Sequence, residues 1–411
     1  MKRYALVGTG HRGFGLYGKA LVEHFSDCVE LSALCDPNRK RALYVQSKLG
    51  DMPVFTDFDE MIQSVPLDGI VLTTVDAYHD EYAVRALAAG LDVLCEKPMA
   101  IDAAKCRAIL EAEQRYGRRI RVTFNCRFMP HIEQLKRIVK SGVLGDILNV
   151  DFEWMLDTSH GADYFRRWHC HMEKSGGLLV HKATHHFDII NFLIDQEPIS
   201  VYAQGSLRFY GGDRRPHGVN CRACETPCPY AFPECDHPDM KGLYFDAEDQ
   251  DGYLRDRCIF DPSIDIYDTM NLAVRYHGGA GMSYSLIAHA PYEGWRLSIS
   301  GTGGRLESSE GGPNTDPDDP CFHTRVFLRD GQTLSYDIRR QEGLHGGSDL
   351  RMLDRLLRHP QDDPLGQCAG SREGALSILV GIAANESIRR GAPVRLSDLV
   401  NLSDYESGPL R

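Results

Sequence analysis

The first 125 residues alternate between short apolar runs and longer amphipathic stretches. The apolar runs predict strands at 4–7, 29–35, 52–55, 69–74, 91–95 and 120–124. Helices are predicted between them, two of which begin after the N-capping residues Asp57 and Asp102, while two end at Gly90 and Gly117. This alternation predicts a doubly wound parallel sheet of the Rossmann type, an α/β fold.

After about residue 125, strand-like runs follow one another with few helices between them. Helices are predicted at 129–141 and 372–390, and strands at 148–155, 200–210, 267–277, 281–288, 295–301 and 325–329. This pattern predicts an α+β domain with an open, mainly antiparallel sheet and helices. We expect a dinucleotide-binding domain at 1–125 and a substrate-binding and oligomerisation domain at 126–411, with an irregular insertion at about 211–262.

Composition excludes several classes of partner. The chain has 411 residues, is 42% hydrophobic and 25% charged, and has a formal net charge of −12. Nucleic acids and membrane surfaces favour basic faces, so neither is an expected partner. No apolar run approaches the ~20 residues that span a bilayer, and Met1, Lys2 and Arg3 lead directly into the first predicted strand. We expect a cytoplasmic protein with a small-molecule substrate. Because a large sheet usually hides one face under helices or another subunit, we also expect a homodimer or homotetramer.

The stretch after the first predicted strand has the spacing G-x-G-x-x-G. Gly8, Gly10 and Gly13 carry it, and Thr9, His11 and Arg12 lie between them. Such a turn lets a pyrophosphate approach the backbone at a helix N-terminus. The next predicted strand ends in Asp36, near the ~20-residue offset at which a carboxylate binds the adenosine ribose. Asp36 would repel a 2′-phosphate, whereas Arg39 and Arg41 follow it closely, so we expect NAD and regard NADP as the weaker alternative.

Two groups of polar residues could perform chemistry near such a cofactor. Lys97 lies between Glu96 and Pro98 at the end of a predicted strand, where a crowded amine can exchange a proton with a substrate hydroxyl. The run from Gly176 to Asp188 holds the second group. If the run is helical, its acid–base side chains form two neighbouring faces, the first made by His181, His185 and Asp188 and the second by Lys182 and His186.

The same run also raises the possibility of a catalytic metal, because two histidines four residues apart can bind zinc. In the usual hydrolase signature a glutamate directly follows the first histidine and acts as the general base. Here Lys182 occupies that position. A zinc hydrolase is therefore disfavoured.

The insertion contains a cluster of cysteines at Cys221, Cys224 and Cys228. Thiolates grouped in this way in a cytosolic protein predict a structural zinc site, which would also tether a loop with few apolar residues. Cys258 is the favoured fourth ligand and Cys235 the alternative. The spacing departs from a paired Cys-x2-Cys ribbon, so thiols without metal, a disulfide or an iron–sulfur centre stay open.

These features together resemble the glucose–fructose oxidoreductase and inositol dehydrogenase family (Gfo/Idh/MocA) over most of the chain. The resemblance is carried by the glycine turn, the run 176–188, the stretch 301–306 and the following residues: Thr73, Thr74, His79, Glu96, Lys97, Pro98, Asn125, Arg127 and Pro130. It implies oxidation of secondary hydroxyls on sugars and cyclitols, or reduction of the corresponding ketones, with NAD or NADP. It further implies that Thr73, Thr74, His79, Glu96, Lys97 and Asn125 border the cofactor, that Arg127 borders the substrate, and that Lys97 and His185 form the catalytic pair.

The chain departs from the family pattern D-x-G-x-H-x-x-D at two positions. His181 replaces the first aspartate and Ala183 replaces the glycine, while His185 and Asp188 keep their places. Proton transfer is therefore expected to involve His181 or Lys182. The stretch 164–169 could bind a sugar ring through Tyr164, Arg167 and Trp168 or could be an ordinary packed loop.

The leading hypothesis is an NAD-dependent dehydrogenase acting on a secondary hydroxyl of a sugar, glycoside or cyclitol. Lys97, His185 and His181 are its predicted catalytic residues, and Lys182 and His186 are predicted to contact the substrate. A first alternative is an NAD-dependent glycosidase that uses transient ring oxidation. A second is a non-catalytic NAD sensor.

Overall fold

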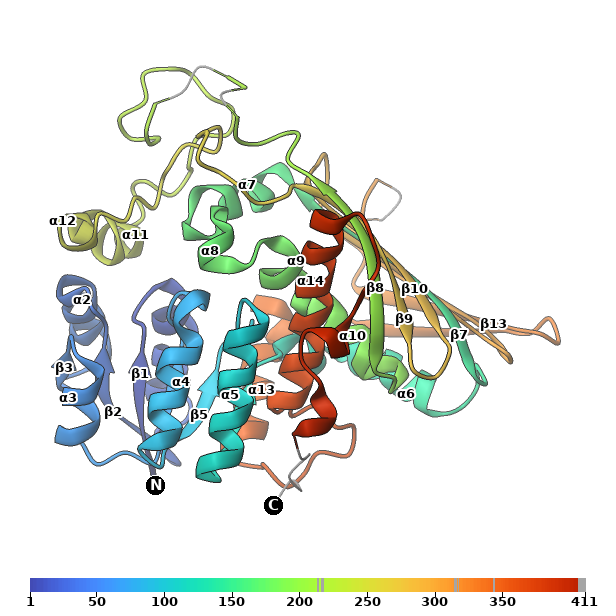
Figure 1. The fold of residues 1–411 in the computed structure, drawn as a ribbon, viewed down its shortest axis with the longest axis horizontal. Coiled ribbons are helices and arrows are strands. Elements are labelled where there is room, and N and C mark those ends of the chain that lie inside the picture. The colour runs from blue at the N-terminus through green and yellow to red at the C-terminus, as the bar shows by residue number, and fades with distance from the viewer. Residues whose placement is uncertain (213, 216–217, 314–315, 317, 343, 406–411) are drawn as a thin grey trace.

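The computed structural model describes residues 1–212, 214–215, 218–313, 316, 318–342 and 344–405. Parts of the predicted insertion (213 and 216–217) and of the second predicted domain, including its end at 406–411, lie outside this set. The chain forms two sheets side by side, each accompanied by its own helices (Figure 1).

The N-terminal sheet has six strands in the order β3-β2-β1-β4-β5-β6, all paired in parallel. Its strands are β1 (Lys2–Val7), β2 (Val29–Cys35), β3 (Val54–Phe55), β4 (Gly69–Leu72), β5 (Asp92–Cys95) and β6 (Ile120–Val122). A π-helical turn (Gly13–Gly18) leads into α1 (Lys19–Glu23), followed by α2 (Arg39–Leu49), α3 (Phe58–Ser64), α4 (His79–Ala88) and α5 (Ala103–Tyr116). Asp57 and Asp102 accept backbone hydrogen bonds from Glu60 and Lys105 and so cap α3 and α5 as predicted. The predicted Rossmann sheet is confirmed.

The second sheet has nine strands in the order β14-β13-β12-β11-β7-β10-β9-β8-β15. They are β7 (Ile147–Asp157), β8 (Pro198–Ser206), β9 (Thr269–Tyr276), β10 (Gly281–Ala290), β11 (Gly294–Gly301), β12 (Gly304–Gly311), β13 (Cys321–Leu328), β14 (Thr333–Arg339) and β15 (Val394–Arg395). All pairs are antiparallel except β7 with β10. The predicted, mainly antiparallel sheet is therefore confirmed, but the two-residue strand β15 was not predicted, and neither were β12 and β14. Their polar side chains outnumber their apolar ones, which weakens the sequence signal.

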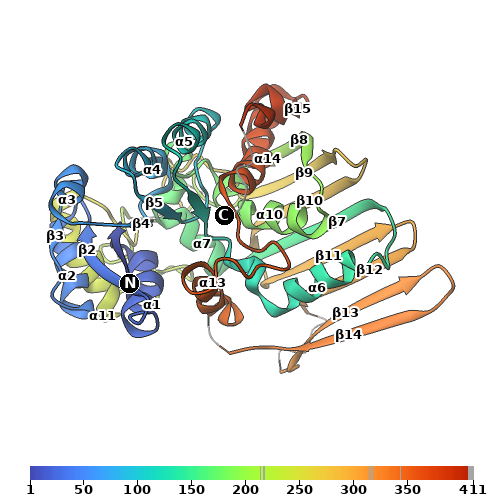
Figure 2. The same cartoon turned by 90° about the horizontal axis from the view of Figure 1, so that it is seen from below.

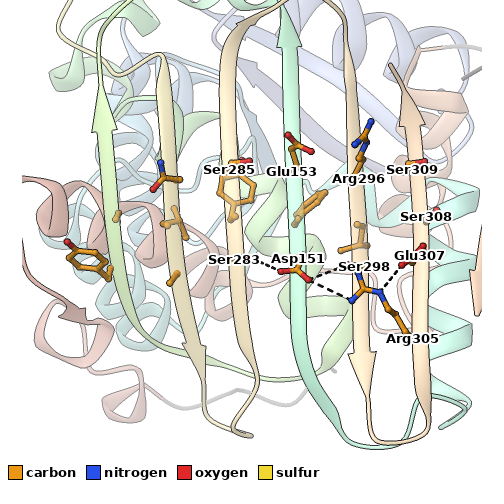
Figure 3. A pocket seen from close by; sticks show the side chains of 18 of the residues that line it. Asp151, Glu153, Ser283, Ser285, Arg296, Ser298, Arg305, Glu307, Ser308 and Ser309 are labelled. Atoms are coloured by element: carbon orange, nitrogen blue, oxygen red, sulfur yellow. Dashed lines mark hydrogen bonds and ion pairs between the residues drawn. The ribbon is translucent and has the colours of Figure 1, made fainter. Parts of the chain in front are cut away.

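The helices of this half are α6 (Pro130–Lys140), α7 (Thr158–Arg166), α8 (Met172–Ser175), α9 (Leu178–His181), α10 (Ala183–Ile194), α13 (Ser348–Leu357) and α14 (Ser371–Arg390). Helices α6, α10 and α14 lie along one face of the nine-stranded sheet (Figure 2). The opposite face carries rows of polar side chains (Figure 3). In the described part of the chain, no helix is long and apolar enough to cross a membrane.

The insertion between β8 and β9 returns to the N-terminal half (Figure 1). Its short helices α11 (Pro238–Leu243) and α12 (Glu248–Asp251) lie beside α2. Acidic side chains of the insertion meet basic ones of α2: Lys40 pairs with Asp249 at 2.7 Å, and Arg41 pairs with Asp251 at 2.7 Å. These contacts place the insertion beside the end of β2, where the predicted ribose-binding acid lies.

Candidate active site

A cavity of about 820 Å³ lies between the carboxyl ends of the parallel strands and the facing strands β7 and β11. The predicted site residues that line it are Gly8, Gly10, His11, Arg12, Asp36, Thr73, Thr74, Glu96, Lys97, Asn125, Tyr164, Arg167, Trp168, His181, Lys182 and His185. Residues from widely separated regions of the sequence therefore share one cavity. The structure brings the glycine turn and the histidine run together.

The glycine turn is sterically restricted at its first and third glycines. Gly8 has a φ of +91°, and a Cβ there would lie 2.7 Å from the backbone of Thr73. A Cβ at Gly13 would lie 2.2 Å from the carbonyl oxygen of Gly8. The hydroxyl of Thr73 donates a 2.6 Å hydrogen bond to that same carbonyl. The tight turn at Gly8 and the close packing at Gly13 thus have a direct steric basis.

Asp36 lies at the end of β2 at the edge of the cavity, and its carboxylate is held by several donors. One oxygen accepts hydrogen bonds from the backbone amide of Thr9 at 2.8 Å and from its hydroxyl at 3.0 Å. The other accepts from the amide of Asn38 at 2.8 Å and lies 3.2 Å from Arg41. Thr9 thus acts on the site by orienting Asp36, and Arg41 places a guanidinium beside the acid.

A tyrosine of the insertion also reaches the glycine turn. The hydroxyl oxygen of Tyr244 accepts a 2.8 Å hydrogen bond from the backbone amide of His11. The guanidinium of Arg41 lies 5.5 Å from the centre of the Tyr244 ring, and its Nε donates to the carbonyl of Leu243 at 2.9 Å. An amide of the glycine turn therefore faces an oxygen acceptor across the cavity. A pyrophosphate oxygen would accept a hydrogen bond from the same kind of backbone amide. The glycine turn therefore fits the phosphates of a dinucleotide.

Glu96 joins the glycine turn to the segment after β5. Its carboxylate accepts hydrogen bonds from Arg12 at 2.7 Å, from Tyr17 at 2.8 Å and from the amide of Lys97 at 3.1 Å. His79, which is fully buried, bonds the carbonyls of Pro98 and Thr74 at 2.8 and 3.2 Å. These contacts fix the backbone on both sides of Lys97.

Lys97 meets His181 where the two halves of the molecule face each other. Its Nζ donates to the carbonyl of His181 at 3.1 Å and lies 3.5 Å from Nε2 of the same residue. Nδ1 of His181 lies 2.5 Å from Oδ2 of Asp76, a residue in the loop after β4. Burial lowers the pKa of Lys97 to about 8, while the carboxylates of Glu96 and Asp76 oppose the shift. Lys97 can therefore exchange a proton near neutral pH.

The remaining predicted substrate contacts surround this corner. Lys182 lies 5.3 Å from the centre of the Trp154 ring, and Arg167 forms a 2.9 Å ion pair with Asp163. The ring of His185 packs edge-on against Phe124, with ring centres 6.0 Å apart. Aromatic and cationic groups therefore line the substrate half of the cavity, which suits a polyhydroxylated ring.

Several predicted residues lie behind the cavity wall. The helical face predicted for His181, His185 and Asp188 is not continuous. A turn at Lys182 separates α9, which holds His181, from α10, which holds the other two. Asp188 forms a buried bidentate ion pair with Arg127, and Nδ1 of His186 bonds the hydroxyl of Tyr284 at 2.6 Å. Arg127 and His186 are thus not brought to the cavity but hold α10 in the domain. The remaining predicted residues outside the lining are Thr9, Gly13 and His79.

The structure does not support the predicted zinc site. Among the residues that it describes, no group of three or more His, Cys, Asp or Glu side chains could hold a metal ion. The sulfurs of the predicted ligands bond separately: Cys221 accepts from Arg166 at 3.4 Å, Cys258 accepts from the amide of Phe260 at 3.5 Å, and Cys224 donates to Thr226 at 3.8 Å. The predicted set of Cys221, Cys224, Cys228 and Cys258, with Cys235 as alternative, is corrected accordingly.

Sequence reasoning missed several residues of the cavity wall. Asp76, in the loop after β4, and Tyr244, in the irregular insertion, were not among the predicted site residues. His131, Trp154, His169, Glu293, Trp295 and Glu310 also line the cavity. Only Asp76 has a usable sequence signal, because it follows a buried strand of a predicted parallel sheet.

Comparison with known proteins covers both halves of the chain. Residues 2–124 match the Gfo/Idh/MocA description "Oxidoreductase family, NAD-binding Rossmann fold", and residues 136–396 match "Oxidoreductase family, C-terminal alpha/beta domain". The protein of Bacillus subtilis (strain 168) named "Putative oxidoreductase YteT" is 36% identical over 440 residues, covering 98% of this chain and 100% of its own.

Two further comparisons concern proteins with described activities or ligands. Inositol 2-dehydrogenase of Corynebacterium glutamicum (strain R) is 27% identical over 223 residues, which cover 52% of this chain and 61% of the dehydrogenase. The structure of the WlbA dehydrogenase from Bordetella pertussis in complex with NADH and UDP-GlcNAcA has a TM-score of 0.67 at 19% identity. That match covers 96% of this chain and 98% of WlbA, and it shows a shared fold.

Proposed function

Because the chain belongs to the Gfo/Idh/MocA family of NAD-binding oxidoreductases, we propose that it is a dehydrogenase for sugars, glycosides or cyclitols. It oxidises a secondary hydroxyl or, in the opposite direction, reduces the ketone. The observation that carries this proposal is the position of Lys97 and His181 in the same cavity as the glycine turn. The similarity to an inositol 2-dehydrogenase supports a polyol substrate.

Different residues of the cavity have different proposed roles. The amides of the glycine turn hold the pyrophosphate, and Asp36 accepts the adenosine ribose hydroxyls. A bound NAD would supply the hydride acceptor for the substrate carbon, so that the oxidation would give a ketone, NADH and a proton. Lys97 in its amine form takes the hydroxyl proton, with His181 as its partner and His185 bonding the substrate on the next helical turn. Tyr164, Arg167, Trp168 and Lys182 form the wall against which the ring binds.

Incubation with NAD and a panel of free sugars, glycosides and inositols tests this function. We expect NADH and a keto product to accumulate together, and Lys97→Met and His185→Ala to abolish both. Cleavage of a glycosidic bond without net NADH would instead establish the NAD-dependent glycosidase. Tight NAD binding with no turnover on any member of the panel would establish the sensor.

We further propose that the polar face of the nine-stranded sheet joins two copies of this chain. Helices α6, α10 and α14 lie on the other face, and charged side chains cross this one in a row (Figure 3). Arg305 lies 2.8 Å from Glu307 and 3.9 Å from Asp151, while Ser283 bonds Asp151 at 2.5 Å. We expect Arg305→Glu to convert a dimer or tetramer to smaller species in sedimentation, and a wild-type monomer would refute the proposal.

A further inference from the structure

A buried acid from the N-terminal half supports the candidate proton-transfer residue of the other half. Asp76 begins the short helical turn Asp76–Tyr78 after β4, whereas His181 ends α9. Oδ2 of Asp76 and Nδ1 of His181 are 2.5 Å apart, and the two residues are only 3% and 7% exposed. A contact so short and so enclosed fixes the imidazole ring in one orientation.

The second ring nitrogen of His181 faces the reactive amine. Its Nε2 lies 3.5 Å from Nζ of Lys97, which also donates to the carbonyl of His181 at 3.1 Å. The three side chains therefore form a continuous chain from a buried carboxylate, through an imidazole, to the amine that opens on the cavity. An acid that accepts the proton of one ring nitrogen leaves the other nitrogen as an acceptor.

We propose that Asp76 is a positioning residue that orients His181 and, through it, the amine of Lys97 for proton transfer. This proposal rests on the proposed dehydrogenase function. Position 181 carries histidine where the family pattern has an aspartate, and Asp76 supplies a carboxylate to that site from the opposite domain. A carboxylate is thus still present beside position 181, on Asp76 instead of on residue 181 itself.

Electrostatics adds support to this geometry. Burial raises the pKa of Asp76 well above its ordinary value, and the Lys97 ammonium is the largest opposing influence. In turn, the Asp76 carboxylate raises the pKa of Lys97 against the effect of burial. The other charged and titratable side chains that face this group are Glu96, Arg12, Arg167, Lys182 and His169. Asp76 and Lys97 are therefore coupled, so a change at one alters the titration of the other.

The substitution Asp76→Asn tests the proposal, because asparagine keeps the shape but removes the charge. We expect kcat to fall roughly 10–100-fold, as for other supporting contacts, with little change in the affinity for NAD. The pKa seen in the pH profile of kcat/KM should move below that of the wild type, because a negative charge beside Lys97 is lost. A merely structural contact would leave that profile in place.

The matched control is Asp80→Asn on α4. This carboxylate lies 2.8 Å from the ammonium of Lys105 and does not line the cavity. The substitution should leave kcat and the pH profile unchanged. An Asp76→Asn enzyme with wild-type kcat and wild-type pH profile would overturn the proposal.

Proton NMR tests this proposal separately from the proposed dehydrogenase function, because the NMR measurement requires no turnover. In the wild-type protein the Nδ1-bound proton of His181 should resonate far downfield, as expected for a short bond to a carboxylate, and Asp76→Asn should move it upfield. An ordinary imidazole signal in the wild-type protein would overturn the proposal even if Asp76→Asn fails to fold. Absence of turnover together with the shifted signal would refute only the dehydrogenase function.

Discussion

At the cofactor end of the cavity, Gly8 and Gly10 lie in the turn directly after β1, and Asp36 directly follows β2. At the catalytic end, Asp76, Lys97 and His181 come from three segments and from both halves of the molecule. The cofactor end is therefore built by local geometry, and we propose that its backbone amides and small residues do most of the cofactor binding. The catalytic end is built by tertiary packing, and its chemistry depends on how burial changes proton affinity.

The two ends should consequently respond to substitution in different ways. A change at the catalytic end should affect turnover and its pH dependence while the cofactor still binds. A change at the cofactor end should affect the affinity for NAD while the chemical step is preserved.

The largest expected effect is on turnover at Lys97. Lys97→Met removes the proton acceptor and should lower kcat by roughly 10²–10⁴-fold, the range for general acid–base groups. NAD affinity, measured by fluorescence titration, should stay within a few fold of wild type. Lys140→Met, at an exposed position on α6, is the control. Loss of NAD binding in Lys97→Met would break the distinction between the two ends.

The next effect concerns the support of α10, which carries His185 into the cavity. Asp188→Leu leaves the buried guanidinium of Arg127 without its partner and should cost about 3–5 kcal/mol in the free energy of unfolding. Chemical denaturation measures this cost. Arg389→Ala, which removes an exposed guanidinium paired with Glu386, should leave the stability almost unchanged. Equal effects would show that the buried pair is not the anchor of this helix.

The pH dependence sharpens the comparison, because Lys97 at the catalytic end is the proposed proton acceptor and burial brings its pKa close to neutral pH. Burial places the pKa of Lys97 at about 8, and the ammonium that forms below this pH cannot accept a proton. In the direction of alcohol oxidation, kcat/KM should therefore fall about tenfold per pH unit below 8 and level off above it. The affinity for NAD, measured over the same range, should stay flat. A rate that falls as pH rises through 8 would contradict Lys97 as the base.

The smallest expected effect lies at the cofactor end, at Tyr244. Its hydroxyl accepts the hydrogen bond of the His11 amide, the kind of donor that a pyrophosphate would use. Tyr244→Phe removes this competitor, so NAD should bind about 2–10-fold more tightly, the equivalent of one hydrogen bond. Tyr116→Phe, at an exposed site that ends α5, is the control. Weaker binding would indicate that the hydroxyl contacts the cofactor directly.

The sequence by itself determined the Rossmann half, because its signals are local. Gly8 and Gly13 occupy positions where a Cβ would collide with backbone. Capping residues such as Asp57 mark the start of a helix through a hydrogen bond to a backbone amide three residues later. Lys97 could likewise be placed at the carboxyl end of a strand from its position after an apolar run. In the second sheet the same reasoning found the strands with alternating apolar residues and missed β12 and β14, whose polar side chains hide the periodicity.

Only the tertiary structure decided which polar residues meet. Asp76 and His181 are far apart in the chain, and nothing in the spacing of either could reveal a 2.5 Å contact. The same holds for Asp188, whose helical spacing from His185 suggested a shared face, yet whose carboxylate is neutralised by Arg127. The clustering of the cysteines likewise predicted a zinc site, but among the residues that the structure describes no group of three or more His, Cys, Asp or Glu side chains could hold a metal ion. Local backbone geometry is determined by residues that are adjacent in the sequence. Charge pairing and proton affinity depend on residues that become neighbours only when the chain folds.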